Sequence, residues 1–128
     1  MTDLLVLQRI AESDFADIVV GTRIVDAKLR VLFTDSSYLD FWWSLEIPGR
    51  FAHHWERSHV DGTIYRHDNM PHSKWLSTAT FPQHYHNGSA DHVGESRLSN
   101  HPETALREFL NFIRSRIGSP NSTDRTAG

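Results

Sequence analysis

The chain has 128 residues, a net charge of −3 and no cysteine. A chain of this length fits one domain with a self-sufficient core, and the missing cysteines exclude disulfides and cysteine-ligated zinc, so that any metal ligands must be His, Asp or Glu. The net negative charge argues against broad electrostatic binding of nucleic acid. The excess of acidic residues lies mainly in residues 1–46, however, so the later half of the chain could still bind RNA.

Apolar spacing predicts a helix and then strands in the first part of the chain. Residues 4–18 have the mixed apolar pattern of a short amphipathic helix. Residues 18–21 and 22–33 are typical of two strands. The Asp- and Ser-rich turn 34–37 then leads to an aromatic-rich strand at 38–45, so 22–33 and 38–45 are predicted to form a hairpin.

Turn residues divide the rest of the chain. Pro48-Gly49 precedes a predicted strand at 51–59, and a turn at 60–62 leads to another at 63–68, which extends the hairpin into an antiparallel meander. Residues 70–100 are predicted to be a long loop with a short strand at 83–86. A capped, amphipathic helix begins at Pro102 and ends before Gly118.

These elements predict a single α+β domain over residues 1–118. Its antiparallel meander packs against the C-terminal helix, and a short helix precedes the sheet. Residues 119–128 are predicted to be a disordered polar tail. No apolar run approaches the roughly 20 residues that cross a bilayer, and the first residues lack the basic region of a secretory signal, so we expect a soluble, cytoplasmic protein.

All nine histidines lie between positions 53 and 101, and two of them have a spacing that indicates a site. His84 and His86 project from the same face if their segment is extended, as in many metal sites and some acid–base pairs. Asp68 and His72 lie upstream, across a bend that contains Pro71. The alternative interpretation is structural, with these rings bonded to the backbone to hold the loop.

Arg66 and Asp68 share one face of their predicted strand. In the functional interpretation Arg66 binds a phosphate or a developing anion, and Asp68 orients a histidine. In the alternative the two form a simple ion pair. The four tryptophans also have two interpretations: they could stack on nucleobases, or they could pack in the core. They are Trp42, Trp43, Trp55 and Trp75.

Three separated motifs, at 51–55, 62–72 and 80–86, resemble in order and spacing those of the TumE-type toxins of prokaryotic toxin–antitoxin modules. The resemblance covers residues 29–117. Two positions depart from the family pattern: His67 stands where tryptophan is frequent, and Gln83 where histidine is common. The resemblance implies a growth-inhibiting toxin with a cognate antitoxin, and it supplies no catalytic residues. A homodimer is left open.

Three hypotheses follow for the activity. In the leading one the toxin cleaves RNA without a cofactor: two of His72, His84 and His86 act as general base and general acid, and Arg66 stabilises the phosphate. RNA is preferred by analogy with other small toxins of such modules.

In the second hypothesis the histidine cluster binds a divalent metal through His84, His86 and either His72 or Asp68. In the third the toxin is not an enzyme: its loop and aromatic residues bind a cellular target, and the histidines are structural. Under each hypothesis the antitoxin is expected to cover the histidine face.

Overall fold

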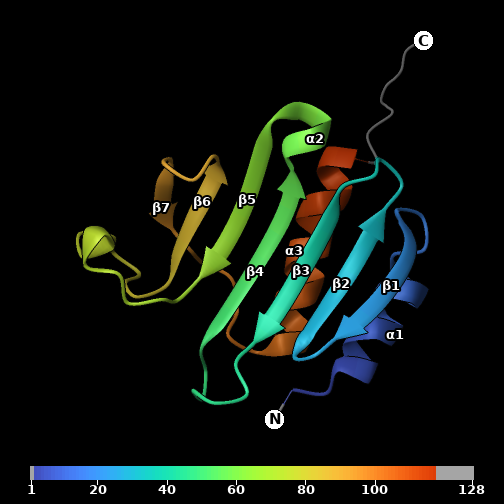
Figure 1. Ribbon diagram of the computed structural model, residues 1–128, viewed down its shortest axis with the longest axis horizontal. Coiled ribbons are helices and arrows are strands. Elements are labelled where there is room, and N and C mark those ends of the chain that lie inside the picture. The colour runs from blue at the N-terminus through green and yellow to red at the C-terminus, as the bar shows by residue number, and fades with distance from the viewer. Residues whose placement is uncertain (1, 118–128) are drawn as a thin grey trace.

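A computed structural model describes residues 2–117 and shows a seven-stranded sheet with two helices on one of its faces (Figure 1). The strands follow one another across the sheet in chain order, and each pairs antiparallel with the next. The predicted α+β meander is therefore confirmed. The strands are β1 (Val19–Val25), β2 (Lys28–Phe33), β3 (Tyr38–Trp43), β4 (Phe51–Arg57), β5 (Thr63–Asp68), β6 (His84–Gly88) and β7 (Val93–Glu95).

The helices α1 (Leu4–Asp14) and α3 (Pro102–Ile117) lie side by side behind the sheet in Figure 1. The Asp3 side chain accepts hydrogen bonds from the backbone N–H groups of Leu5 and Val6, which caps the start of α1. Two short helical turns lie in the connections, α2 (Ser58–Asp61) and the 3₁₀ turn η1 (Ser73–Trp75).

The core lies between the helices and the sheet, because alternate residues of β2, β3 and β4 are fully buried against α1 and α3. Helix α3 buries the apolar stripe that its sequence predicts. The core residues of α3 are Ala105, Leu106, Phe109, Leu110 and Ile113. Neither α1 nor α3 packs on the opposite face of the sheet, so we call this the open face (Figure 1).

Several predicted boundaries are wrong. The predicted strands 18–21 and 22–33 are replaced by β1 and β2, which meet in a tight turn at Asp26-Ala27 where Asp26 adopts a positive φ of 56°. Aspartate tolerates this left-handed conformation better than most residues, so the turn needs no glycine. The predicted helix 4–18 ends at Asp14.

The second half differs from prediction in two places. The predicted strand 51–59 ends at Arg57, and α2 follows it and closes at Gly62, whose φ of 83° suits glycine. The predicted loop 70–100 contains the expected short strand as β6, and β7 pairs with β6. No helix within residues 2–117 is long and apolar enough to cross a membrane. The polar tail predicted at 119–128 lies outside the described residues.

Candidate functional site

The register of β5 and β6 brings an aspartate and two histidines together on the open face. Asp68 lies directly opposite His84, and Arg66 lies opposite His86 on the same two strands. Asp68 Oδ1 is 3.0 Å from Nε2 of His84, and Asp68 Oδ2 is 3.7 Å from Nε2 of His86. We call this group the Asp68–His84–His86 cluster. It joins side chains from the motifs at 62–72 and 80–86.

The other nitrogen of each ring is held by the backbone. Nδ1 of His84 lies 2.9 Å from the carbonyl oxygen of Pro82, and Nδ1 of His86 lies 2.9 Å from that of Ala90. A carbonyl oxygen only accepts hydrogen bonds, so each Nδ1 carries the hydrogen and donates it. Each neutral ring therefore presents its lone pair at Nε2, on the side that faces Asp68.

Asp68 is fixed from three sides. Its carboxylate accepts hydrogen bonds from Nε of Arg66, at 2.9 Å, and from the backbone N–H of Met70, at 3.1 Å. Burial alone would raise the pKa of Asp68, but the contacts with His86, Arg66 and Met70 outweigh it and lower the pKa to about 2. The carboxylate is therefore ionised throughout the physiological pH range.

The cluster is shielded from solvent by the segment that carries η1. The side chains of His84, His86 and Asp68 are 2%, 11% and 5% exposed. The ring of Trp75 lies 5.9 Å from each histidine ring, measured between ring centres. Nζ of Lys74 in turn lies 4.9 Å from the centre of the Trp75 ring. Trp75 thus covers the cluster, and access to it passes the η1 turn, in which Ser73 and Lys74 are exposed.

His72 lies apart from this arrangement. Its ring Nδ1 accepts a hydrogen bond from the backbone N–H of Lys74, which caps η1, and its side chain is exposed. No hydrogen bond or ion pair in the described part of the chain joins His72 to the cluster. Of the five candidate residues from the sequence, the sheet therefore unites four, Arg66, Asp68, His84 and His86.

A groove of about 700 Å³ runs along the open face beside Arg66. Asp40, His54, Arg66 and His86 are successive cross-strand partners from β3 to β6, and the first three of them line the groove. Nε2 of His54 lies 2.9 Å from Glu56. Sequence reasoning did not select Asp40 or His54, although alternation along the strands would have placed His54 on the face of Arg66.

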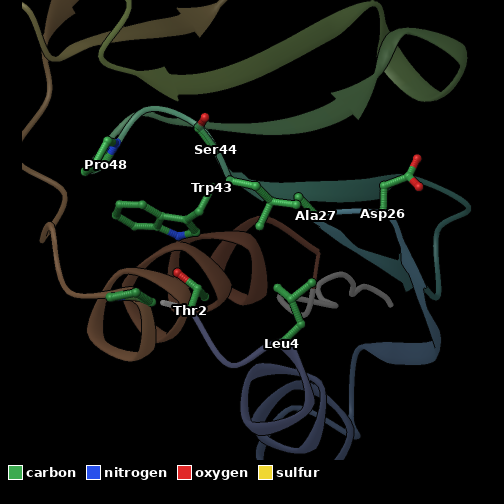
Figure 2. A pocket seen from close by; sticks show the side chains of 10 residues that line it. Thr2, Leu4, Asp26, Ala27, Trp43, Ser44 and Pro48 are labelled. Atoms are coloured by element: carbon green, nitrogen blue, oxygen red, sulfur yellow. The ribbon is translucent and has the colours of Figure 1, made fainter.

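A second cavity, of about 530 Å³, lies where the starts of α1 and α3 meet the β3–β4 connection. Figure 2 shows the Trp43 ring extending from the sheet above Thr2, and Leu4 and Pro48 also line the cavity. None of the residues of the Asp68–His84–His86 cluster lines it. Trp43 belongs mainly to the core, being 9% exposed.

Two further histidines face the helices and are part of the core. The fully buried His53 stacks on Phe41, with ring centres 3.6 Å apart. It lies directly opposite His67, which stacks on Tyr85 at 4.2 Å and bonds Ser96 through Nδ1. Burial lowers the pKa of both rings, that of His67 to about 4. Both rings are therefore neutral near pH 7 and have a packing role.

The fold and the site define a small α+β protein with a shielded Asp–His–His cluster at the edge of an open sheet. Residues 3–117 match the model of the TumE family, described as Toxin TumE, and the chain belongs to this family of toxins. The match also includes α1 and β1, which precede the segment that the motifs covered. The comparisons with curated proteins and with solved structures gave no significant match.

Proposed function

We propose that this toxin is one half of a toxin–antitoxin module and that it stops growth by cleaving RNA at the Asp68–His84–His86 cluster. The convergence of these three side chains next to Arg66, which lines the groove, is the observation that supports this most directly. Ionisable groups gathered at a cleft, each with its orientation fixed by a second contact, are typical of reaction centres.

Arg66 is suited to the phosphate of such a substrate. Its side chain is 33% exposed, lines the groove and donates to Asp68 through Nε. That bond fixes one edge of the guanidinium, and its terminal N–H groups remain as donors for a phosphate oxygen. The charge that develops on the phosphate during cleavage would then lie next to a positioned cation.

The reaction we propose is an internal transesterification. The ribose 2′-oxygen loses its proton to a base held at the cluster and attacks the adjacent phosphorus. The bond between the phosphorus and the 5′-oxygen breaks, and the 5′-oxygen takes up a proton. The products are a 2′,3′-cyclic phosphate and a 5′-hydroxyl.

The antitoxin in this proposal covers the open face. Within residues 2–117 neither α1 nor α3 packs on that face, which presents the groove, and the η1 segment covers it only at the cluster. Covering it would block the substrate without any change in the fold. Hydrogen exchange of the toxin with and without its antitoxin tests this: protection should appear in β4 to β6. Protection confined to α1 and α3 would contradict it.

The test of the activity uses purified chain, single-stranded RNA and the variant Asp68→Asn. We expect cyclic-phosphate ends with the parent chain and at least roughly a hundredfold slower cleavage with Asp68→Asn, because catalytic groups of this kind typically contribute that much. Asp91→Asn, at an exposed position in the β6–β7 turn, is the matched control and should cleave normally. Equal cleavage by parent and Asp68→Asn would contradict the proposal.

A further inference from the structure

We infer that the Asp68–His84–His86 cluster binds one divalent transition-metal ion of the Zn²⁺ class, with Asp68, Nε2 of His84 and Nε2 of His86 as its ligands. This deepens the proposed function and rests on it for the role of the ion. The binding itself can be measured without RNA, so the two proposals can fail separately.

The first argument is the placement of the ring hydrogens. With each Nδ1 donating to a carbonyl oxygen, the Nε2 atoms of His84 and His86 are the ring atoms left to face the Asp68 carboxylate. Lone pairs that face a carboxylate repel it unless a cation lies between them. A metal ion in that space would be bound by both Nε2 atoms and by the carboxylate.

The distances suit an ion. Donors that bind zinc at roughly 2.0–2.2 Å in a tetrahedral arrangement lie about 3.4 Å from each other. The two contacts of Asp68 with the histidine nitrogens, at 3.0 and 3.7 Å, lie on either side of that value. All three donor atoms lie within 4.8 Å of one another. Small side-chain movements would therefore be enough to complete the site.

The supporting contacts match those of known metal sites. A metal-binding histidine nearly always donates its other ring N–H to a carbonyl or a carboxylate, and this fixes the ring and the tautomer. Here the carbonyls of Pro82 and Ala90 do so. The ligating carboxylate is usually hydrogen-bonded too, and Arg66 and the Met70 N–H hold Asp68.

The donor set selects the kind of ion. Two imidazole nitrogens and one carboxylate suit Zn²⁺, Mn²⁺ or Fe²⁺, whereas Mg²⁺ and Ca²⁺ prefer oxygen ligands throughout. Three protein ligands leave a coordination position for water or substrate, as in catalytic zinc sites. With the ion bound, the carboxylate is outweighed by the ion and by Arg66, so the site becomes positive and attracts a phosphate.

The experiment starts from full-length chain stripped with a chelator and dialysed. Zn²⁺ binding is measured by isothermal titration calorimetry, and Co²⁺ is used as a spectroscopic substitute whose visible absorption reports imidazole and carboxylate ligands. We expect one ion per chain. Asp68→Asn and His84→Gln should each weaken binding by roughly tenfold or more. His92→Gln, an exposed histidine of the β6–β7 turn, is the control and should bind as the parent does.

Three results would overturn the inference: no Zn²⁺ or Co²⁺ binding by the parent, binding unchanged in Asp68→Asn and His84→Gln, or equal losses in His92→Gln. If a variant fails to fold, the test of the inference is whether the Co²⁺ spectrum of the parent shows imidazole and carboxylate ligands. RNA cleavage that persists in chelator, together with absent binding, would reject the metal and leave the proposed function standing. Metal binding without RNA cleavage would keep the site and reject that function.

Discussion

Asp68 and His84 face each other across β5 and β6, with Asp68 Oδ1 3.0 Å from Nε2 of His84 and both side chains almost fully buried. The contact joins the last residue of β5 to the first residue of β6. It also explains why the sheet, rather than the loop between the strands, determines the geometry of the cluster.

Asp68→Asn should lower the free energy of unfolding by about 1–3 kcal/mol, because the amide has the shape of the carboxylate but leaves the donors of Arg66 and Met70 without a charged acceptor. Denaturant unfolding at pH 7 with chelator present measures this. A variant as stable as the parent would show that the carboxylate charge contributes nothing to the fold.

Acid should destabilise the protein through His53 and His67. Burial lowers the pKa of both rings below the unfolded value of 6.5, that of His67 to about 4, so protons bind more tightly to the unfolded chain. The contribution of His67 is complete above pH 6.5 and is lost as the pH falls toward 4. The urea midpoint should therefore drop between pH 7.5 and 5.

His53→Leu isolates the part of this effect that comes from His53. Among residues 2–117 neither ring nitrogen of His53 has a hydrogen-bond partner, so a leucine there removes two buried polar atoms. The urea midpoint of the variant should fall less between pH 7.5 and 5 than that of the parent. An equal fall would assign the acid sensitivity to other groups.

Ser37→Ala should cost about 1–3 kcal/mol of stability, because the Ser37 hydroxyl is the acceptor for the buried indole N–H of Trp55, at 2.9 Å. Thermal or denaturant unfolding measures the loss. Ser89→Ala, at an exposed position, is the matched control and should change stability by less than about 0.5 kcal/mol. Similar effects of the two substitutions would contradict the assigned role of Ser37.

Trp75→Ala should expose the cluster with little change in global stability. Trp75 lies in a short turn whose hydrogen bonds are mainly local, so we expect a loss within about 1 kcal/mol. Acylation of His84 and His86 by diethyl pyrocarbonate, followed by mass spectrometry, should become faster, while the rate at His92 stays the same. Unchanged rates at the cluster would mean that Trp75 does not limit access.

The sequence predicted most of the fold because its apolar pattern has clear periods. The stripe of α3 and the alternation of β3 and β4 are strong local signals, and both are confirmed. The turn at Asp26-Ala27 lacks glycine and proline, so β1 and β2 could not be separated at the right place. β7 has only three residues, and one of them is Gly94, so its local sequence does not predict a strand. Its strand conformation depends on its pairing with β6.

The site was predictable in its parts and not in its assembly. Alternation placed Arg66 with Asp68 and His84 with His86, and the structure confirms both placements. A long connection joins β5 to β6, and the length of such a connection does not predict which residues of the two strands pair. For the same reason His72, close to Asp68 in sequence, could not be separated from the cluster in advance.

The measurement that tests the central claim most directly is growth of a bacterial host on induction of the parent chain beside the double variant His84→Ala, His86→Ala. Circular dichroism confirms that both chains fold. Our account predicts arrest by the parent and normal growth with the folded double variant. Arrest by both folded chains would contradict it and place the toxic surface outside the cluster.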